Sequence, residues 1–597
     1  MDESLRDAAI PSEGGSNHSL RHSFERARVA LIHYKVEVLC AGILIAVAVN
    51  LTSVLGRKSI TADEIVLIPA AYYNLVTDDF QLVREHPPLC KLLAGVPLLF
   101  VQPQELPADA LSPTLSRGDR EWFYAIRFWE DNRAQFEAIC FWARLPMIAL
   151  TVVFGWLVFA FGRNLFGPRA GLFALALFAL EPTLLAHGRV VQTDVVAAFG
   201  FLLAAFSLQH YFRKPDWKTA AGVGAAAGVA MLAKFSMVIL GPVLLVVFLV
   251  MLWRSWRERR AIAWHGVAAS VASLLVVNAG YFFRHRPLVS ADIEWARRSF
   301  PASATEVLAS IRIFRYLLPT DFLIGIYWQL HHSSEGHPAG LLGMYSQRGW
   351  WYYFPVAFAL KATIPFLLLA LASLAWATYR VVYKHEREFL YLLIPFTVYT
   401  LFVMMSPIDI GVRYYLPAYG FLFILGGCLF DSLLRQRKSA KAALALSLVV
   451  LLSLSWMLVE SVRAYPNYMS YMNQFASARP HWWYLSDSNV EWGDDVKLLA
   501  EYLKARGETR TRALLLGGYV TLGFYGVEYL DAISPSEQPP RYLALGASFL
   551  NGSTVPGHDI DGKPATETQR VNTFAEFRDR APEAIIGDSI YLYRVHE

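Results

Sequence analysis

Long apolar runs separated by short polar turns occupy most of the chain. Many of these runs reach 18 or more residues, which is the length expected of membrane helices rather than of buried core helices. The pattern predicts about eleven transmembrane helices. They are expected at about 38–55, 141–161, 170–187, 191–210, 219–233, 236–253, 264–283, 352–379, 389–405, 414–430 and 441–460.

The short turns between these runs are rich in Lys and Arg and contain few acidic residues. With a cytoplasmic N-terminus, every short basic turn falls on the cytoplasmic side, as the positive-inside rule requires. The order of the runs and the placement of charge therefore support the same topology. The basic residues are Arg163 and Arg169; Arg213, Lys214 and Lys218; Arg254, Arg257, Arg259 and Arg260; Arg380, Lys384 and Arg387; Arg435, Arg437, Lys438 and Lys441.

The same topology places three long segments on the extracytoplasmic side: 56–140, 284–351 and 461–597. In the last segment, "GDDVKLLAEYLKARG" predicts an amphipathic helix that ends at Gly507. The stretches "RALLLGG", "RYLALGA" and "SIYLYRVH" predict short strands. We therefore expect a disordered cytoplasmic N-terminus (1–35), a membrane domain (36–460) and a small extracytoplasmic α/β domain (461–597).

Composition supports a membrane protein and favours no nucleic-acid partner. Of the 597 residues, 55% are hydrophobic and 17% charged, against about 25% charged in ordinary soluble domains. The net charge of +5 is modest, and no phosphate-binding Gly-rich loop is present. The four cysteines show no CxxC spacing. The sequence allows two alternatives for Cys90 and Cys140: a disulfide between them, or two unpaired thiols.

Ionisable residues gather at the predicted extracytoplasmic face, where burial near lipid makes them costly and therefore informative. Each has a simpler explanation. Asp63 and Glu64 suit a helix start, Lys234 suits a side chain that extends to the interface, and Arg413 suits an interfacial anchor. These explanations leave the convergence of carboxylates and cations on one face unexplained. The candidates are Asp63, Glu64, Glu85, His86, Lys91, His187, Arg189, Asp194, Lys234, His337, Lys361, Arg413 and Tyr414.

Carboxylates and cations beside a lipid layer suit sugar transfer from a lipid-linked phosphate. Lys and Arg would bind the anionic phosphate, and Arg can grip two oxygens. A carboxylate would take a proton from the acceptor hydroxyl or amine. The cations would then stabilise the departing lipid phosphate.

Five motifs resemble the GT-C fold glycosyltransferases of family 39, which include protein O-mannosyltransferases and relatives of the lipid A aminoarabinose transferase. They are the pair Asp63-Glu64, "EHPPLCKLL", "AHGRVVQTDVVAAF", "RYYLP", and the joint occurrence of "GHPAGLLGMYSQRGWWYYFPVAFALK" with "LSDSNVEWGDDVKLLAEYL". The resemblance covers about residues 36–506. It implies a polyprenyl-phosphate sugar donor, inversion at the anomeric carbon, and an active site on the extracytoplasmic side of a bacterial inner membrane.

The resemblance also assigns roles to residues. It implies Asp63 as general base, with Glu64 supporting it or sharing acceptor contacts, and Asp194 near the sugar or acceptor. It implies a donor-phosphate or loop-holding role for the cationic and aromatic candidates, and pocket roles for the others. The first set is Lys91, Arg189, Lys234, Lys361, Arg413 and Tyr414; the second is Glu85, His86, His187 and His337.

The chain departs from some of these relatives. No β-trefoil insertion is evident, so a protein acceptor is only one option beside a glycan or a lipid. A divalent metal is not required by a monophosphate donor, and the histidines, including "HHSSEGH", show no compact ligand spacing. A multi-span transporter or lipid flippase stays as the alternative function, although such proteins usually carry internal repeats and charges near the bilayer midplane.

Overall fold

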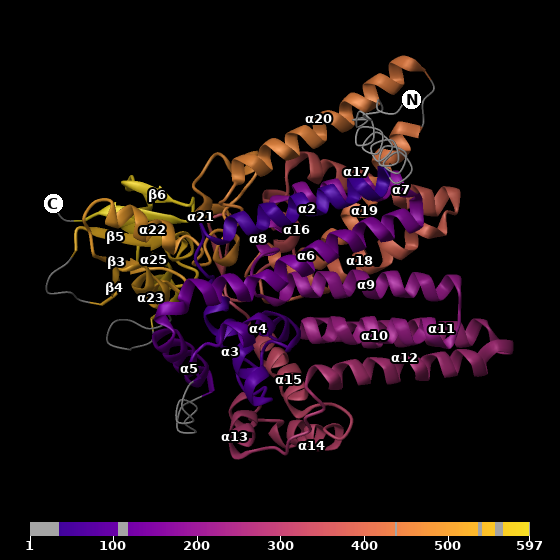
Figure 1. Ribbon diagram of the computed structural model, residues 1–597, viewed down its shortest axis with the longest axis horizontal. Coiled ribbons are helices and arrows are strands. Elements are labelled where there is room, and N and C mark those ends of the chain that lie inside the picture. Colours follow the sequence, from indigo (N-terminus) through magenta and orange to yellow (C-terminus); the bar gives the residue numbers. More distant parts are fainter. Residues whose placement is uncertain (1–34, 106–116, 436–438, 535–539, 556–564, 596–597) are drawn as a thin grey trace, which may run out of the picture.

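The computed structural model describes residues 35–105, 117–435, 439–534, 540–555 and 565–595. Nearly all of the N-terminal segment 1–35, predicted to be disordered, lies outside these residues. A bundle of roughly parallel and antiparallel long helices forms the body, and a sheet domain lies at one end of it (Figure 1). A polytopic helical chain with a small C-terminal sheet domain is what the sequence predicts, and the structure confirms both parts.

Nine helical stretches within the described residues are long and apolar enough to cross a membrane, and four of them begin with a 3-10 turn. The protein is therefore a multi-pass membrane protein. The helices are α2 (Lys35–Leu55), α6 (Phe136–Phe166), α9 (Thr193–Arg213), α11 (Leu240–Arg254), α12 (Arg259–Gly280), α17 (Ile364–Lys384), α18 (Leu390–Met404), α19 (Leu416–Arg435) and α20 (Ala440–Ala464).

Two further predicted spans form shorter helices inside the bundle. Helix α7 (Pro168–Leu180) packs on α6 and α19, and α10 (Trp217–Ala233) packs on α9 and α12. Two of the predicted apolar runs are each divided into two helices in the structure. The run 170–187 divides at Glu181 into α7 and α8 (Pro182–His187), and the run 352–379 divides into α16 (Tyr353–Lys361) and α17. At each break a proline stands at the start of the second helix: Pro182 is the first residue of α8, and Pro365 is the second residue of α17. The fixed φ of proline suits the first turn of a helix.

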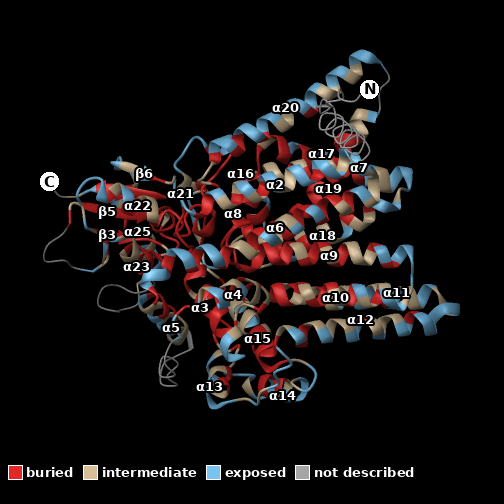
Figure 2. Cartoon of the chain, viewed as in Figure 1, coloured by how far each residue is buried: buried red, intermediate tan, exposed pale blue. Residues whose placement is uncertain are grey.

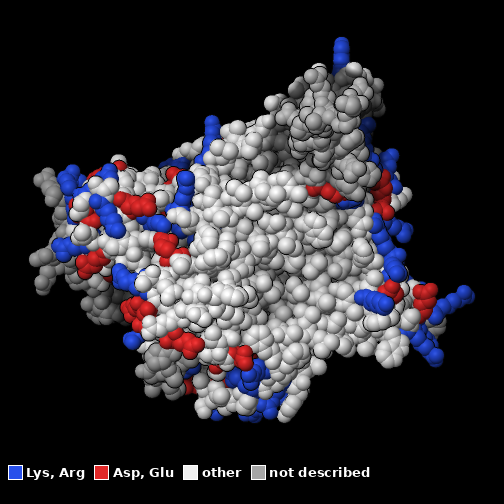
Figure 3. Space-filling model, viewed as in Figure 1, with Lys and Arg blue, Asp and Glu red and all other residues white. Residues whose placement is uncertain are grey.

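Burial separates a central helix from lipid-facing ones. Every residue of α19 from Leu416 to Asp431 is buried, whereas α20 exposes most of its apolar side chains (Figure 2). The visible face between the two ends of the bundle carries almost no Lys, Arg, Asp or Glu (Figure 3). A broad uncharged belt between two charged ends is the surface that a bilayer core requires.

The connections at the sheet-domain end are long and folded. The first holds α3 (Ala62–Thr77), α4 (Leu89–Val101) and α5 (Arg117–Asp131). The second holds α13 (Ser290–Ser299), α14 (Ala304–Phe314), α15 (Thr320–Glu335) and a hairpin of β1 (Ala339–Leu341) and β2 (Met344–Ser346). The turns α9–α10 and α11–α12 lie at the opposite end (Figure 1).

The C-terminal domain is a five-stranded mixed sheet with the order β4-β3-β5-β7-β6. Strand β3 pairs in parallel with β4 and β5, and β7 pairs antiparallel with β5 and β6. The three predicted strands are β3 (Arg510–Leu514), β5 (Tyr542–Gly546) and β7 (Ile590–Arg594), and the predicted helix is α22 (Val496–Lys504). The sequence missed the edge strands β4 (Glu528–Asp531) and β6 (Ala584–Ile586), and the short helices α21 (His481–Tyr484), α23 (Gly518–Thr521), α24 (Ala547–Asn551), α25 (Glu567–Asn572) and α26 (Ala575–Arg578).

Candidate active site

Four charged residues far apart in the sequence meet at the sheet-domain end of the bundle. Arg413 donates to Asp63 across 2.7 Å, and the same Nη1 atom lies 3.6 Å from Asp194 Oδ2. The Lys234 ammonium donates to Asp194 Oδ1. We call Asp63, Asp194, Lys234 and Arg413 the charged cluster.

Helix ends hold these side chains in place. Asp63 and Asp194 lie in the first turns of α3 and α9, where the helix dipole favours a negative charge. Lys234 is the C-cap of α10, where a cation is favoured. Arg413 lies in a 3-10 turn (Val412–Tyr415) that leads into α19. The same end of the bundle therefore supplies all four groups.

Aromatic rings cover the two cations. Lys234 Nζ lies 3.3 Å from the centroid of the Tyr414 ring, and the Arg413 guanidinium lies 4.1 Å from the Trp492 ring. A cation over such a face is stabilised by the ring quadrupole. Trp492 belongs to the C-terminal segment and is not among the predicted site residues, although it lies within the motif "LSDSNVEWGDDVKLLAEYL".

The two carboxylates of the charged cluster differ in access. The Asp63 side chain is 27% exposed, whereas that of Asp194 is 2% exposed. Asp194 lies between the two cations and is closed to solvent. Its role is therefore to hold Lys234 and Arg413 in place. Asp63 is the carboxylate that an incoming molecule can reach.

Glu64 faces away from this access route, which differs from the expectation that it supports Asp63 or shares acceptor contacts. Its fully buried carboxylate accepts from the Arg144 guanidinium at 2.7 Å and from the backbone N–H groups of Val191 and Thr61 at 2.9 and 2.8 Å. Thr61 is the N-cap of α3. Glu64 therefore ties α3 to α6 and to the loop before α9, and the helix-start explanation fits it.

Three predicted phosphate-binding cations are used inside the protein. Lys91 Nζ donates to the carbonyl oxygens of Leu82 and Val83, the latter at 2.8 Å. Lys361 Nζ donates to the carbonyl oxygens of Met469 and Asn489 at 2.7 and 2.6 Å. These contacts fit the loop-holding role that the resemblance implies as the alternative to phosphate binding.

Arg189 is the third such cation. It is fully buried and pairs with Asp494 across 3.0 Å. The pair joins the loop before α9 to the C-terminal segment.

The remaining predicted residues surround the charged cluster. His86 lies near enough to Asp63 and Lys234 for both to shift its pKa, which partial burial lowers, and Glu85 precedes it. Burial lowers the pKa of His187 to about 3, so this imidazole is neutral, and it lies edge-on to Trp492. The His337 Nδ1–H donates to the carbonyl oxygen of the next residue, Pro338, across 3.0 Å.

Metal and disulfide chemistry find no support in the described part of the chain. No group of three or more His, Cys, Asp or Glu side chains there is arranged to hold a metal ion. Cys40, Cys90, Cys140 and Cys428 are all free and buried, so the alternative of unpaired thiols holds for Cys90 and Cys140.

An apolar groove starts at the charged cluster and runs among the membrane helices. Its volume is about 380 Å³, and its wall contains Lys234 and Tyr414 beside apolar groups of α11, α15 and α18, such as Pro242, Ile326 and Val403. A groove that is lined by apolar side chains and has a cation at one end suits a ligand with a long apolar tail and an anionic head.

Comparison with known proteins adds a family match for part of the chain. Residues 136–279 match the family described as dolichyl-phosphate-mannose-protein mannosyltransferase. No curated protein matches the chain.

Solved structures are similar at low identity. ArnT from Cupriavidus metallidurans bound to undecaprenyl phosphate is 13% identical, with 86% of this chain and 93% of that chain covered and a TM-score of 0.47. The Archaeoglobus fulgidus oligosaccharyltransferase in the apo form is 12% identical over 82% of this chain and 64% of that chain, with a TM-score of 0.47. The family match over residues 136–279 confirms, for that part of the chain, the family resemblance expected from the sequence.

Proposed function

We propose that the protein is a membrane glycosyltransferase that moves a sugar from a polyprenyl-phosphate donor to an envelope acceptor. The observation that carries the proposal is the position of the Lys234 ammonium. It lies in the wall of the apolar groove and also in the charged cluster, beside a partly exposed carboxylate. ArnT from Cupriavidus metallidurans binds undecaprenyl phosphate, and the oligosaccharyltransferase AglB from Archaeoglobus fulgidus binds a dolichol-phosphate.

The groove and the two cations would bind different parts of the donor. The polyprenyl tail would lie in the groove, and its phosphate would bind Lys234 and Arg413. Arg413 is now held by Asp63, 2.7 Å away. A phosphate that takes over this guanidinium would release Asp63, because both anions compete for the same donors. Donor binding would thus free the carboxylate for catalysis.

Asp63 would act as the general base. An acceptor hydroxyl or amine attacks the anomeric carbon, its proton passes to Asp63, and the bond from that carbon to the phosphate oxygen breaks. The electron pair leaves with the polyprenyl phosphate, whose charge Lys234 and Arg413 stabilise. A single displacement of this kind inverts the anomeric configuration. Asp194 would hold both cations without touching the reacting atoms.

The proposed location is the extracytoplasmic side of a bacterial inner membrane. The basic turns and the charged cluster lie at opposite ends of the bundle, and positive residues favour the cytoplasm. The acceptor is a protein, a glycan or a lipid, and the sugar is a hexose or pentose, as family 39 implies. No metal is assigned to the reaction.

Mass spectrometry of envelope glycans and glycolipids, with and without the gene, tests this function. We expect one sugar to disappear from one acceptor and to return with the wild-type gene. An unchanged envelope, together with transport of a solute or lipid into vesicles that contain the purified protein, would favour the transporter or flippase alternative. Labelling of single cysteines at positions 63 and 550 on opposite membrane sides would overturn the topology.

A further inference from the structure

A second cavity opens on the C-terminal domain, away from the charged cluster. It has a volume of about 360 Å³ and lies between the loop that leads into α21 and the hairpin of β6 and β7. This volume is at the lower end of the range of small-molecule sites. The proposed transfer reaction gives this cavity no role.

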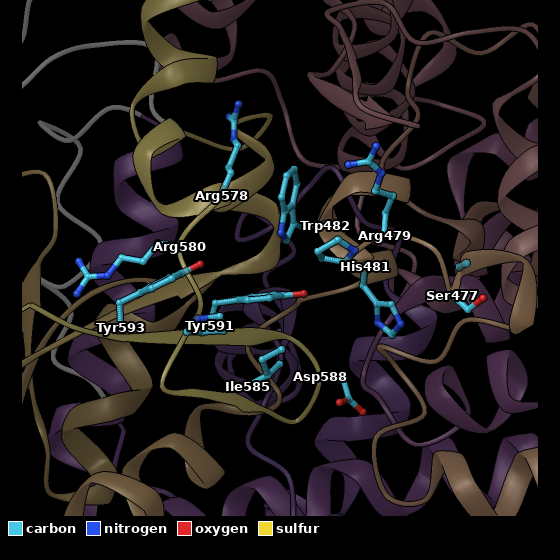
Figure 4. A pocket seen from close by; sticks show the side chains of 13 residues that line it. Ser477, Arg479, His481, Trp482, Arg578, Arg580, Ile585, Asp588, Tyr591 and Tyr593 are labelled. Atoms are coloured by element: carbon cyan, nitrogen blue, oxygen red, sulfur yellow. The ribbon is translucent and has the colours of Figure 1, made fainter.

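Three aromatic residues line the cavity. Tyr591 and Tyr593 are two positions apart on β7, so both point to the same face of the sheet. Figure 4 shows their rings side by side, with Trp482 beyond them. Tyr593 donates to the Phe577 carbonyl oxygen across 2.9 Å, which fixes its ring. Both tyrosines are buried, at 5% and 1% exposure, so they form the floor of the cavity, and the partly exposed Trp482 is the ring that can cover the C–H face of a sugar.

Two arginines stand at opposite ends of this aromatic surface (Figure 4). Arg479 is exposed and, among the described residues, has no hydrogen-bond or carboxylate partner; its guanidinium lies over the Trp483 ring, 5.9 Å from the centroid. Arg580 is exposed and donates one N–H to the Arg594 carbonyl oxygen, which leaves other donors open. Arg578 differs, because its guanidinium turns away and donates to the carbonyl oxygens of Leu550 and Asn551.

The other polar groups suit a hydroxylated ligand. Partial burial lowers the pKa of His481, so near neutral pH its ring offers one donor and one acceptor. Asp588 is exposed at the hairpin turn, and its carboxylate can accept from sugar hydroxyls. One accessible aromatic ring, two available guanidinium groups and one acceptor together favour a sugar chain that carries negative charge.

We propose that this cavity binds an acidic oligosaccharide. The Trp482 ring would cover a sugar ring, and Arg479 and Arg580 would each bind a carboxylate or phosphate of the chain. Arg is the residue best shaped for such two-oxygen contacts. Binding requires neither the donor lipid nor the transfer reaction, so it stands or falls separately from the proposed function.

The same segment of chain links this cavity to the charged cluster. From Trp482 it continues to Ser486, whose hydroxyl accepts from the Gly340 N–H at 2.8 Å, and on to Trp492 under Arg413. If the protein has the proposed transferase function, the segment from Trp482 to Trp492 contacts both a sugar chain in the cavity and the charged cluster. The cavity would then anchor an acidic part of the acceptor, an extension that rests on the proposed function.

Isothermal titration of the purified full-length protein in detergent tests the site. The probe is tetragalacturonate, compared with neutral maltotetraose and with tetraglutamate. We expect saturable binding of tetragalacturonate, and at least tenfold weaker binding of the other two. Equal binding of maltotetraose or tetraglutamate would overturn the proposal, as would the absence of saturable tetragalacturonate binding at millimolar concentration.

Substitutions locate the site. Arg479→Gln and Arg580→Gln should each weaken tetragalacturonate binding about tenfold, in the range of a lost hydrogen-bonded charge contact. Both side chains are exposed, so the thermal unfolding midpoint should stay at the wild-type value. Arg312→Gln, an exposed arginine on α14, is the matched control and should change neither quantity. Unchanged affinity in both cavity variants would place the ligand elsewhere and refute the assignment.

Discussion

The sharpest test of the proposed chemistry is Asp63→Asn. Asparagine has the size of aspartate and can still accept from Arg413, but it cannot take the acceptor's proton. Loss of a general base typically lowers the rate by about 10² to 10⁴, or about 2.7 to 5.5 kcal/mol in the barrier. We expect a rate loss in this range with donor binding retained.

The structure predicts little loss of stability from the same change. Asp63 is 27% exposed, and pairs that reach solvent contribute about 0.2 to 1 kcal/mol. Arg413 also keeps Asp194 at 3.6 Å and the Trp492 ring at 4.1 Å. The effect on the barrier therefore exceeds the effect on unfolding several-fold, which separates catalysis from folding.

The assay measures polyprenyl phosphate released from the lipid-linked sugar by purified full-length protein, once envelope mass spectrometry has identified the sugar and acceptor. Asp78→Asn is the matched control. It makes the same change at the other end of α3, where the residue has a φ of 54° that asparagine tolerates. The control should keep the wild-type rate. An Asp63→Asn enzyme that retains more than about a tenth of the wild-type rate would refute the assignment of the base.

Three further predictions test the surroundings of the cluster. Lys234→Gln should raise the Kd for undecaprenyl phosphate about tenfold to a hundredfold in titration calorimetry, because a charged hydrogen bond to the phosphate is lost, and an unchanged Kd would contradict the donor site. Glu64→Gln should lower the free energy of unfolding by about 3 to 5 kcal/mol, because the Arg144 guanidinium keeps no charged partner in its buried place; a thermal shift equivalent to less than about 1 kcal/mol would refute this structural role. Burial raises the pKa of Asp409 from 3.8 to about 7, so the folded state binds this proton more tightly, and stability falls as the pH rises from about 4 to 7, by at most about 4 kcal/mol. The unfolding midpoint of Asp409→Asn, measured relative to that of wild type, should therefore rise between about pH 5 and pH 8. The midpoint of the exposed control Asp579→Asn should not rise relative to wild type.

Sequence patterns predicted the membrane helices well because bilayer thickness fixes their length. They failed at positions such as Thr363, where a long apolar run is broken. The long apolar runs on both sides hide this break, which is marked only by Lys361, Thr363 and Pro365. The edge strands β4 and β6 were missed because they are short and partly exposed, and so lack a clear alternation of apolar and polar residues.

For the candidate site, the sequence predicted which end of the bundle would collect charge but not which charges would meet. Asp63, Asp194, Lys234 and Arg413 do meet. Lys361 carries the same kind of charge at the same end, yet its hydrogens go to two carbonyl oxygens. Such a difference depends on side-chain direction at helix ends, which charge and spacing do not encode.

The contact between the last outer segment and the charged cluster has a consequence for how the protein is made. The Ala62 N–H donates to the Trp492 carbonyl oxygen at 2.9 Å, and Arg189 pairs with Asp494. The loop that carries Asp63 therefore gains its final support only after more than four-fifths of the chain has been synthesised. A ribosome-bound or truncated membrane domain would hold Asp63 and Arg413 without this support, so under the proposed function activity would begin only once the C-terminal domain has folded onto the bundle.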